Sequence, residues 1–412
     1  MPQPERRTRV DLAAAAVIVV VIAVAGVAIW STSAVRGTSS DPARNSALPP
    51  ASASSVPSGL TEVWRAASNA TTVPVVIGPV VVTGDGRAVI GHDPSTGRQL
   101  WSYRRDLPLC GVAGWPGSGR DYVIAVYRNA RGCSEVTALD PATGQRAASR
   151  SSDADSTLDF SVDKEYFLAQ GDTRLETWRS DLVRTIEYGR VDAPVNPGAQ
   201  PRSGCALLSS ANGSGRVAVV ERCGIEPGYR LTVLGATLDK DEKLDEQGST
   251  LITADLGSPP RVVAVGQDAV AVYVSSPSPM LETYAVDGTL RGRTTLLGRA
   301  VGVESKPTTS SGLITFWTGD ATVVLDASTL QARFQVPATL GPGVVMAGSL
   351  LLPSASGISE HNIVDGRPIR SIPVQRSGYG GGIITLGLIG DNVVQQWGST
   401  ISVLKPSPVS AE

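Results

Sequence analysis

Short apolar runs alternate with polar turn sequences along most of the chain, and this pattern predicts strands rather than helices. The clearest copy is residues 80–104, VVVTGDGRAVIGHDPSTGRQLWSYR. Residues 80–83 form an apolar, β-branched run of the kind that strands favour. Asp85-Gly86 is typical of a tight hairpin turn, and residues 88–90 predict the returning strand. The copy therefore reads as strand, turn, strand, turn, strand.

The second turn of this copy carries its most specific residues. Asp93 can accept hydrogen bonds from backbone N–H groups, and Gly97 can adopt the left-handed conformation that such a turn needs. Trp101 lies on the strand that follows, where a large aromatic side chain can pack against a neighbouring unit. Units of this kind cannot bury their apolar faces alone, so we expect them to pack side by side around an axis.

Looser copies of this unit recur toward the C-terminus. Asp140 and Gly144 take the same places in residues 136–149, which have no tryptophan. The turn aspartates expected in later copies are Asp181, Asp239 or Asp241, Asp287, Asp326 and Asp365. The last three are 39 residues apart, and the blades of a β-propeller repeat with a period of about 40 to 50 residues.

The two ends of the repeat region supply the pieces of one further blade. Residues 60–66 form a strand before the first complete copy, and residues 392–404 supply two strands with no fourth. Pairing these segments would close the ring and remove its exposed edges. The sequence therefore predicts an all-β, eight-bladed β-propeller that follows one N-terminal transmembrane helix. Seven blades is the alternative.

The repeat resembles that of the pyrroloquinoline-quinone-type (PQQ-like) β-propellers, whose core reads A-L-D-x-x-T-G-x-x-x-W. The matching residues are Asp93, Thr96, Gly97 and Trp101 in the first copy and Ala138, Leu139, Asp140, Thr143 and Gly144 in the second. The resemblance covers about residues 60–404. The chain looks most like the single-pass, membrane-anchored propellers of this type in actinobacteria.

The resemblance has two functional branches. Quinone-dependent dehydrogenases of this type hold a quinone and calcium at the propeller axis, and many of the alcohol dehydrogenases add a disulfide between adjacent cysteines. This chain is much shorter and has no adjacent cysteines, so no cofactor is expected. The closer analogue is the propeller of the outer-membrane-protein assembly lipoprotein, which implies protein partners and no quinone. The lipid-attachment cysteine of that protein is absent here.

The N-terminus predicts where the propeller resides. Residues 12–30, LAAAAVIVVVIAVAGVAIW, carry no charge and are long enough to span a bilayer. Three arginines, Arg6, Arg7 and Arg9, precede them. The positive-inside rule therefore predicts a cytoplasmic tail over residues 1–11 and an extracytoplasmic propeller. The competing interpretation is a cleaved signal peptide with a site at residues 32–34, but the apolar run exceeds the roughly 7–15 residues of a signal core.

The remaining domain boundaries follow from composition. Residues 31–59 are dominated by Ser, Ala and Pro and have almost no large apolar side chains, so we expect a disordered linker that acts as a flexible stalk. The propeller is expected over residues 60–405 and a short tail over residues 406–412.

Four cysteines fit an oxidising compartment. Three connectivities are open, and the sequential pairs Cys110–Cys133 and Cys205–Cys223 are favoured because each pair falls within one predicted blade. Zinc binding is the rival interpretation, and it is disfavoured because no C-x-x-C spacing occurs.

The candidate catalytic and ligand-binding motifs are incomplete. The only two histidines, His92 and His361, have no carboxylate or nucleophile at a recognisable spacing. The acidic segment 151–165 lacks the glycine and terminal glutamate of a helix-loop-helix calcium site. The glycine-rich segment 378–382 lacks the lysine and helix of a phosphate loop. The formal net charge of −2 argues against nucleic acid as a partner.

Two functional hypotheses remain from the sequence. The first is a scaffold or sensor, anchored in the membrane, that binds another protein of the cell envelope through one propeller face. The second is an extracytoplasmic enzyme with a site in the central channel, such as a quinone-dependent oxidoreductase or a lyase. The absence of a catalytic motif favours the binding role.

Overall fold

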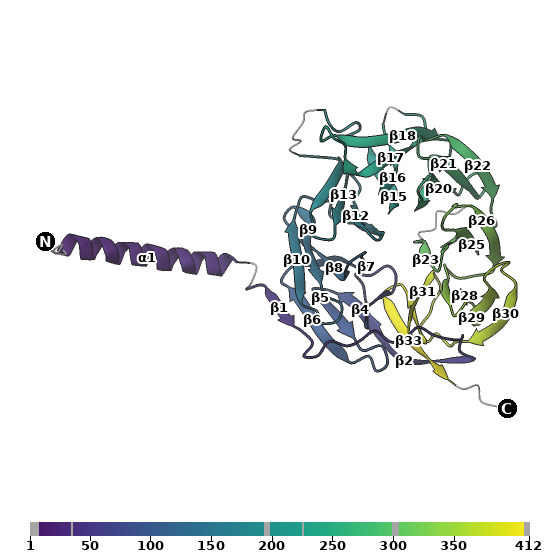
Figure 1. Cartoon of the computed structure of the whole chain (residues 1–412), viewed down its shortest axis with the longest axis horizontal. Coiled ribbons are helices and arrows are strands. Elements are labelled where there is room, and N and C mark those ends of the chain that lie inside the picture. The colour runs from purple at the N-terminus through teal and green to yellow at the C-terminus, as the bar shows by residue number, and fades with distance from the viewer. Residues whose placement is uncertain (1–7, 34–35, 193–197, 225, 299–304, 408–412) are drawn as a thin grey trace.

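The computed structural model describes residues 8–33, 36–192, 198–224, 226–298 and 305–407. In these residues, eight antiparallel sheets, seven with four strands and one with five, form a closed ring (Figure 1), as the sequence predicts, and this excludes the seven-bladed alternative. Residues 1–7 of the expected cytoplasmic tail 1–11, and residues 408–412 of the expected tail 406–412, lie outside the described residues.

The blades are numbered here in chain order, and each runs from the innermost to the outermost strand. Blade 1 consists of β3 (Val75–Ile77), β4 (Val80–Asp85), β5 (Ala88–His92) and β6 (Gln99–Arg105). Blade 2 consists of β7 (Leu109–Pro116), β8 (Asp121–Asn129), β9 (Gly132–Leu139) and β10 (Arg146–Ser151). Blade 3 consists of β11 (Asp159–Val162), β12 (Tyr166–Gln170), β13 (Arg174–Arg179) and β14 (Arg184–Gly189). Blade 4 consists of β15 (Ala206–Gly213), β16 (Arg216–Arg222), β17 (Tyr229–Leu238) and β18 (Leu244–Ile252).

The second half of the ring has the same order. Blade 5 consists of β19 (Arg261–Val265), β20 (Ala269–Val274), β21 (Met280–Ala285) and β22 (Leu290–Thr295). Blade 6 consists of β23 (Thr308–Ser310), β24 (Leu313–Trp317), β25 (Ala321–Asp326) and β26 (Ala332–Pro337). Blade 7 is β27 (Val344–Met346), β28 (Ser349–Ser354), β29 (Gly357–Asn362) and β30 (Pro368–Pro373), and blade 8 is β31 (Ile384–Ile389), β32 (Asn392–Trp397), β33 (Thr400–Ser407) and β2 (Gly59–Ala67).

Blade 8 closes the ring with strands from both ends of the repeat region. The C-terminal part supplies three strands rather than the two expected, because β31 precedes the pair that the sequence indicated. The N-terminal strand β2 then adds as the outermost strand, in antiparallel register from Gly59 opposite Ser407 to Ala67 opposite Thr400. The last strand therefore runs two residues beyond the expected boundary at residue 405.

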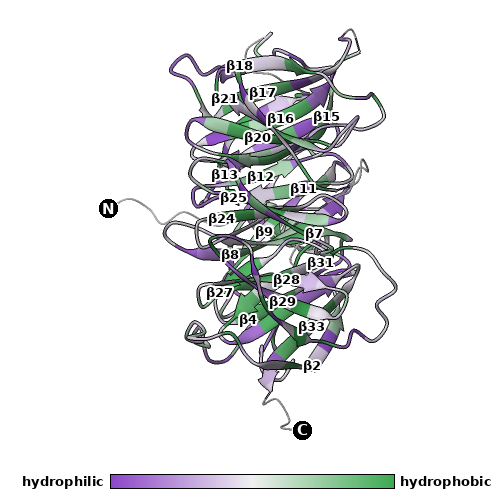
Figure 2. Ribbon diagram, turned by 90° about the vertical axis from the view of Figure 1, so that its right-hand side faces the viewer, coloured by the Kyte–Doolittle hydropathy of each residue, from purple (hydrophilic) through white to green (hydrophobic). Residues whose placement is uncertain are grey.

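The hydrophobic core lies between neighbouring blades rather than inside each one. The second strand of most blades is buried on both sides, as in β8, where Val123 through Tyr127 are all inaccessible to solvent. Such a strand packs against the next blade with one face and the previous blade with the other, so its sequence is a continuous apolar run instead of an alternating one. Figure 2 shows the ring edge-on, with the apolar colour concentrated in the strands.

In the described part of the N-terminal region, one helix, α1 (Arg9–Thr32), precedes the ring. It begins at a capping box in which the Thr8 and Asp11 side chains each accept from the other's backbone N–H group. By length and composition, its residues Arg9–Ser31 are apolar enough to cross a membrane. The helix extends the expected apolar span of residues 12–30 by a few residues at each end.

The segment between the helix and the ring differs from the expected free linker. Residues 38–41 form β1 (Thr38–Asp41), which pairs antiparallel with β6 and adds a fifth strand to the outer edge of blade 1. Farther along, the Val56 carbonyl accepts a hydrogen bond from the Arg370 guanidinium of blade 7 at 2.9 Å. The described part of this segment therefore lies along the propeller rather than standing off as a stalk.

Candidate interaction face

The alternating strand directions divide the ring into two faces. Connections between the first and second strands of a blade, and between its third and fourth, lie on one side, which we call the turn face. Connections between the second and third strands, and those from one blade to the next, lie on the other side, which we call the loop face. The longest connections, residues 190–205, 296–307 and 374–383, all belong to the loop face.

The repeat aspartates lie on the turn face and shape the turn between the third and fourth strands. Asp93 Oδ1 accepts from the backbone N–H groups of Ser95 and Thr96 at 2.9 and 3.0 Å. Gly97 closes this turn with a φ of +72°, a conformation that glycine adopts without steric cost. Asp140 and Gly144 in blade 2, and Asp326 in blade 6, form equivalent turns through hydrogen bonds to Thr143, and to Ser328 and Thr329.

Three of the expected turn aspartates, Asp181, Asp287 and Asp365, take other positions in their turns. In blade 7 the first turn residue is Asn362, whose side-chain oxygen accepts from Val364 N at 2.8 Å. Asp365 lies three residues later and accepts from Arg367 N at 3.1 Å. In blades 3 and 5 the turns begin at Arg179 and Ala285, so Asp181 and Asp287 are their third residues. The equal 39-residue steps therefore do not mark equivalent turn positions.

Trp101 joins blade 1 to blade 2. It is fully buried on β6, and its indole Nε1 donates to the Pro141 carbonyl at 2.8 Å, in the turn of the next blade. A Cβ atom on Gly144 would lie 2.5 Å from the Trp101 ring, so only glycine leaves room for it. The repeat residues D-x-x-T-G and W thus form one contact between adjacent blades.

The same contact occurs at the closing blade, where the sequence analysis did not identify it. Trp64 on β2 donates through Nε1 to the Pro94 carbonyl at 3.0 Å and lies against Gly97. The sequence does carry a signal for this contact, because Trp64 lies on β2, the fourth strand of blade 8, as Trp101 lies on β6, the fourth strand of blade 1.

Both histidines belong to these turns and not to a catalytic group. His92 Nδ1 lies 3.0 Å from the Gly97 carbonyl, and its Nε2 lies 2.9 Å from Thr83 Oγ1. His361 makes the corresponding contacts with the Gly366 carbonyl and Ser359 in blade 7. Burial lowers the pKa of His92, although the hydrogen bond to Gly97 acts in the opposite direction.

Two disulfides fix connections of the loop face, and both pairings are those that the sequence predicts. Cys110–Cys133 joins the starts of β7 and β9 in blade 2, with 6.0 Å between the two Cα atoms. Cys205–Cys223 joins the residue before β15 to the residue after β16 in blade 4. Both bonds therefore lie on the same face of the ring, two blades apart.

Blade 3, between the disulfides, is held on this face by Asp155. Its carboxylate accepts from the backbone N–H groups of Thr173 and Arg174 at 2.7 and 3.0 Å and from the Thr173 hydroxyl at 2.7 Å. Burial alone would raise the pKa of Asp155, but these hydrogen bonds outweigh it and leave the pKa lowered. The Asp155 carbonyl also accepts from Cys133 N at 2.9 Å, so the connection 152–158 is fixed to blades 2 and 3.

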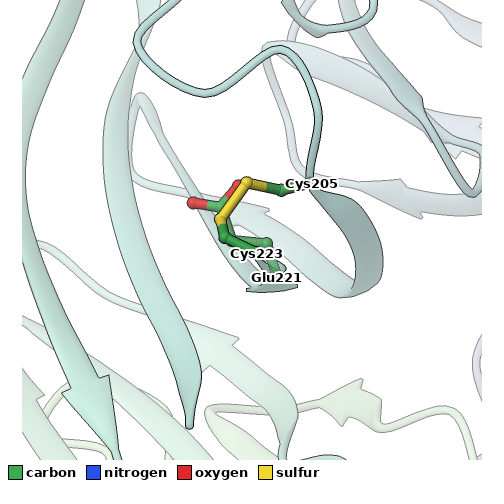
Figure 3. A group of neighbouring side chains, drawn as sticks. All are labelled: Cys205, Glu221 and Cys223. Atoms are coloured by element: carbon green, nitrogen blue, oxygen red, sulfur yellow. A yellow bond between two sulfur atoms is a disulfide. The ribbon is translucent and has the colours of Figure 1, made fainter. Parts of the chain in front are cut away.

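A buried carboxylate lies beneath the second disulfide. Figure 3 shows Glu221 beside Cys205 and Cys223. Its oxygens accept from the Tyr188 hydroxyl at 2.8 and 2.9 Å, from the Thr232 hydroxyl at 2.6 Å and from Arg202 Nε at 3.0 Å. Burial, followed by the Glu221 charge, raises the pKa of Tyr188.

This cluster has the residue types of a metal site but not its chemistry. Both sulfur atoms are used in the disulfide and offer no thiolate. The Glu221 oxygens are already engaged by protein donors, among them the positive Arg202. The arrangement braces the connection 198–205 against blades 3 and 4.

We therefore define a loop platform on the loop face of blades 2 to 5. It consists of the described residues of the connections 152–158, 171–173, 190–205, 223–228 and 253–260. The last two are braced as well. In the connection 223–228, Glu226 pairs with the Arg230 guanidinium. In the connection 253–260, the carbonyls of Asp255 and Leu256 accept hydrogen bonds from the Tyr229 hydroxyl.

Comparisons with known proteins agree with the ring and its repeat. A family model described as outer membrane protein assembly factor BamB matches residues 53–220, less than half of the chain. The crystal structure of BamB from Moraxella catarrhalis is 14% identical and covers 86% of this chain and 99% of that chain, with a TM-score of 0.51. The C-terminal WD40 domain of Sif2 is 8% identical and covers 86% and 100%, with a TM-score of 0.55. No curated protein matches the chain in sequence.

The chain folds as a PQQ-like β-propeller. At these sequence identities the two solved structures show the fold alone, so the function must be argued from the residues of this chain.

The inner wall of the PQQ-like propeller does not fit a quinone and calcium at its axis. The eight innermost strands carry only two charged residues, Asp159 and Arg261. Asp159 is already paired, because Lys306 Nζ lies 3.1 Å from its Oδ1 and also donates to the Phe160 carbonyl at 3.1 Å. Among the described residues of this wall, no set of carboxylates converges on a cation.

The acidic segment 151–165 does not assemble a calcium site either. Asp153 pairs with Arg131 at 3.7 Å on the loop face. Asp163 instead lies in the turn between β11 and β12, on the turn face, where it accepts from Glu165 N and Tyr166 N. The four aspartates of the segment are therefore used separately, each by its own local contacts.

Proposed function

We propose that this PQQ-like propeller is a membrane-anchored scaffold that binds another protein of the cell envelope through the loop platform. The observation that carries the proposal is that the disulfides Cys110–Cys133 and Cys205–Cys223 and the Asp155 contacts all fix neighbouring connections of one face. Connections between strands are normally the mobile part of a fold, so fixing several on one side needs a reason.

The reason that we propose is preorganisation for binding. A surface whose loops are already ordered loses less conformational entropy when it contacts a partner. The platform also presents the exposed Leu256 and the partly exposed Arg190, a mixture of apolar and charged groups that suits a protein partner better than a small molecule.

The proposed location follows from α1 and the disulfides together. The helix has the length and composition of a membrane span, and disulfides persist in oxidising compartments. The arginines before the helix favour a cytoplasmic N-terminus and an extracytoplasmic propeller. The enzyme hypothesis has no comparable support, because the described inner wall brings no acid, base and nucleophile together.

The test is cross-linking in intact cells, with the full-length protein purified and its partners identified by mass spectrometry. An anchor-only chain, residues 1–58, is the control for non-specific membrane capture. We expect one reproducible envelope protein that the anchor-only control does not capture. If no protein exceeds that control, the scaffold function is wrong.

A matched pair of variants then tests the platform itself. Leu256→Glu places a charge on the platform, at a side chain that is 61% exposed. Val364→Glu makes the same change on the turn face, at a side chain that is 72% exposed. We expect the partner to be lost with the first variant and retained with the second. Loss in both variants, or retention in both, contradicts binding through the platform.

A further inference from the structure

The distance along the chain between the membrane helix and the propeller is very short. The helix α1 ends at Thr32, and β1 begins at Thr38. A fully extended chain advances at most about 3.5 Å per residue, so the steps from residue 33 to residue 38 span no more than about 18 Å. A four-stranded blade is about 14 Å across, because neighbouring strands lie about 4.8 Å apart. The spacer is thus about as long as one blade is wide.

The strand β1 fixes the end of this spacer to blade 1. Its four residues pair with β6 from Thr38 opposite Arg105 to Asp41 opposite Ser102. The pairing continues one residue earlier, because Asp106 N donates to the Gly37 carbonyl at 2.6 Å. In Figure 1, β1 lies on the rim of the ring between α1 and β6.

The rest of the segment continues as a strap across the turn face. Ala43 N donates to the Thr143 carbonyl in a turn of blade 2. Pro50 lies against Gly390 in a turn of blade 8, where a Cβ on that glycine would be 3.2 Å away. The Val56 carbonyl then contacts Arg370 of blade 7. The strap occupies the turn face and leads directly into β2.

Charged and aromatic side chains at this rim suit a lipid surface. Trp30 stands in the last turn of α1, where tryptophan is enriched at membrane interfaces, and the Arg36 guanidinium carbon lies 4.7 Å from its ring centroid. Arg44 and the exposed Arg104 add positive charge beside β1, partly offset by Asp41 and the exposed Asp106. Anionic lipid headgroups attract such clusters near the end of an anchor.

From these contacts we infer that β1 is a docking strand that holds the outer edge of blade 1 against anionic lipid headgroups. The inference rests on the proposed membrane anchor and goes beyond it, because it assigns the part of the propeller that faces the membrane. Blade 5 lies opposite blade 1 in the ring, so its outer strand β22 is farthest from the bilayer. The propeller is then fixed at the membrane surface, and its loop platform stays accessible from the side.

The experiment measures energy transfer from a fluorophore on the propeller to an acceptor on the lipid headgroups. The full-length protein is placed in nanodiscs that contain phosphatidylglycerol, and it is labelled either at Gln99→Cys on β6 or at Leu290→Cys on β22. Both positions are exposed. We expect several-fold more transfer from position 99 than from position 290. Equal transfer from the two positions overturns the inference.

A proline variant tests whether β1 causes the orientation. Ser39→Pro with Ser40→Pro removes two N–H donors from β1, and the matched control Ser46→Pro with Ala47→Pro makes the same change in the strap outside any strand. We expect the difference between the labels to fall at least twofold in the first variant and to persist in the control. An unchanged difference in the first variant overturns the role of β1.

Two further readouts separate this inference from the proposed anchor and scaffold. If α1 does not anchor the chain, the protein leaves the nanodisc fraction altogether, whereas a wrong orientation leaves it anchored with equal transfer. Replacing phosphatidylglycerol by phosphatidylcholine should reduce the difference between labels, and no reduction would overturn the contact with anionic headgroups. None of these measurements depends on whether the propeller has a protein partner.

Discussion

Replacing Trp101 by phenylalanine tests how adjacent blades of this propeller are held together. The Trp101 side chain is inaccessible to solvent, and its Nε1 is a hydrogen-bond donor to the buried Pro141 carbonyl at 2.8 Å. Phenylalanine keeps an aromatic ring against Gly144 but has no donor. The variant therefore removes one hydrogen bond and part of one packing contact at the interface of blades 1 and 2.

The expected cost can be estimated from these two losses. A buried carbonyl left without a donor costs about 1 to 3 kcal/mol. The smaller ring loses buried apolar surface and leaves a void, which costs about 1 to 2 kcal/mol more. We expect Trp101→Phe to lower the free energy of unfolding by about 3 kcal/mol.

Trp64 provides the matched control within the same chain. It makes the same hydrogen bond, at 3.0 Å to the Pro94 carbonyl, but both residues are partly exposed. Water can replace the lost donor there, so we expect Trp64→Phe to cost about 1 kcal/mol.

The assay is urea unfolding of the full-length protein in detergent, followed by circular dichroism in the strand region. If the free energy of unfolding depends on urea concentration with the same slope in the two variants and in the unmodified chain, the difference in midpoint urea concentration reports the difference in stability. The reasoning is refuted if Trp64→Phe costs as much as Trp101→Phe, because burial of the acceptor would then not decide the loss.

Three further predictions use the same unfolding measurement. Replacing Cys205 and Cys223 together by serine should cost about 3 kcal/mol, from the 18-residue separation that this disulfide closes, and should make the stability less sensitive to reductant. Burial lowers the pKa of His92 in the folded chain below its ordinary value of 6.5, so the unfolded chain binds more protons as the pH falls. Stability should therefore be constant above about pH 7 and decrease as the pH falls through 6.5. His92→Gln should abolish that fall, and an unchanged profile would contradict it. Gly144→Ala should cost more than Gly86→Ala, since both glycines have positive φ but only the first would place a Cβ 2.5 Å from an indole ring.

The repeat turns could be predicted because their determinants are local. Asp93 accepts from N–H groups two and three residues later, and Gly97 supplies the left-handed conformation within the same five residues. The prediction was wrong at Asp365, because Asn362, three residues earlier, makes the equivalent hydrogen bonds. Asn and Asp are interchangeable acceptors at such a turn, so spacing between aspartates alone could not locate it.

The strand β1 could not be predicted from its sequence. Its residues TSSD are polar and largely exposed, because a strand added to the outer edge of a blade buries neither face. Hydrogen bonds between backbones hold it, and these leave no pattern of apolar positions. The composition of residues 31–59 indicates that they form no core of their own, but it does not reveal that described residues of this segment bind along an existing fold.

The contacts of the loop platform were equally hidden. Glu221 and Tyr188 are 33 residues apart, and Asp155 and Thr173 are 18 apart, so no motif links them. The cysteine pairing was accessible because each pair falls within one blade. The pairing alone, however, did not show that both disulfides belong to the same face.

The two faces of the ring differ in the length of their connections and in how these are held, and this difference supports the proposed function. On the turn face, the described connections are short, and residues 43–58 run across part of it as a strap. On the loop face, the connections are longer, and disulfides and buried ion pairs hold several of them in place. Long connections give up conformational entropy when they are ordered, and that loss is offset here by covalent and ionic contacts rather than by a larger core. A chain that fixes the described residues of several connections on the side away from its own strap keeps that side available for a partner. The pair Leu256→Glu and Val364→Glu tests that consequence directly.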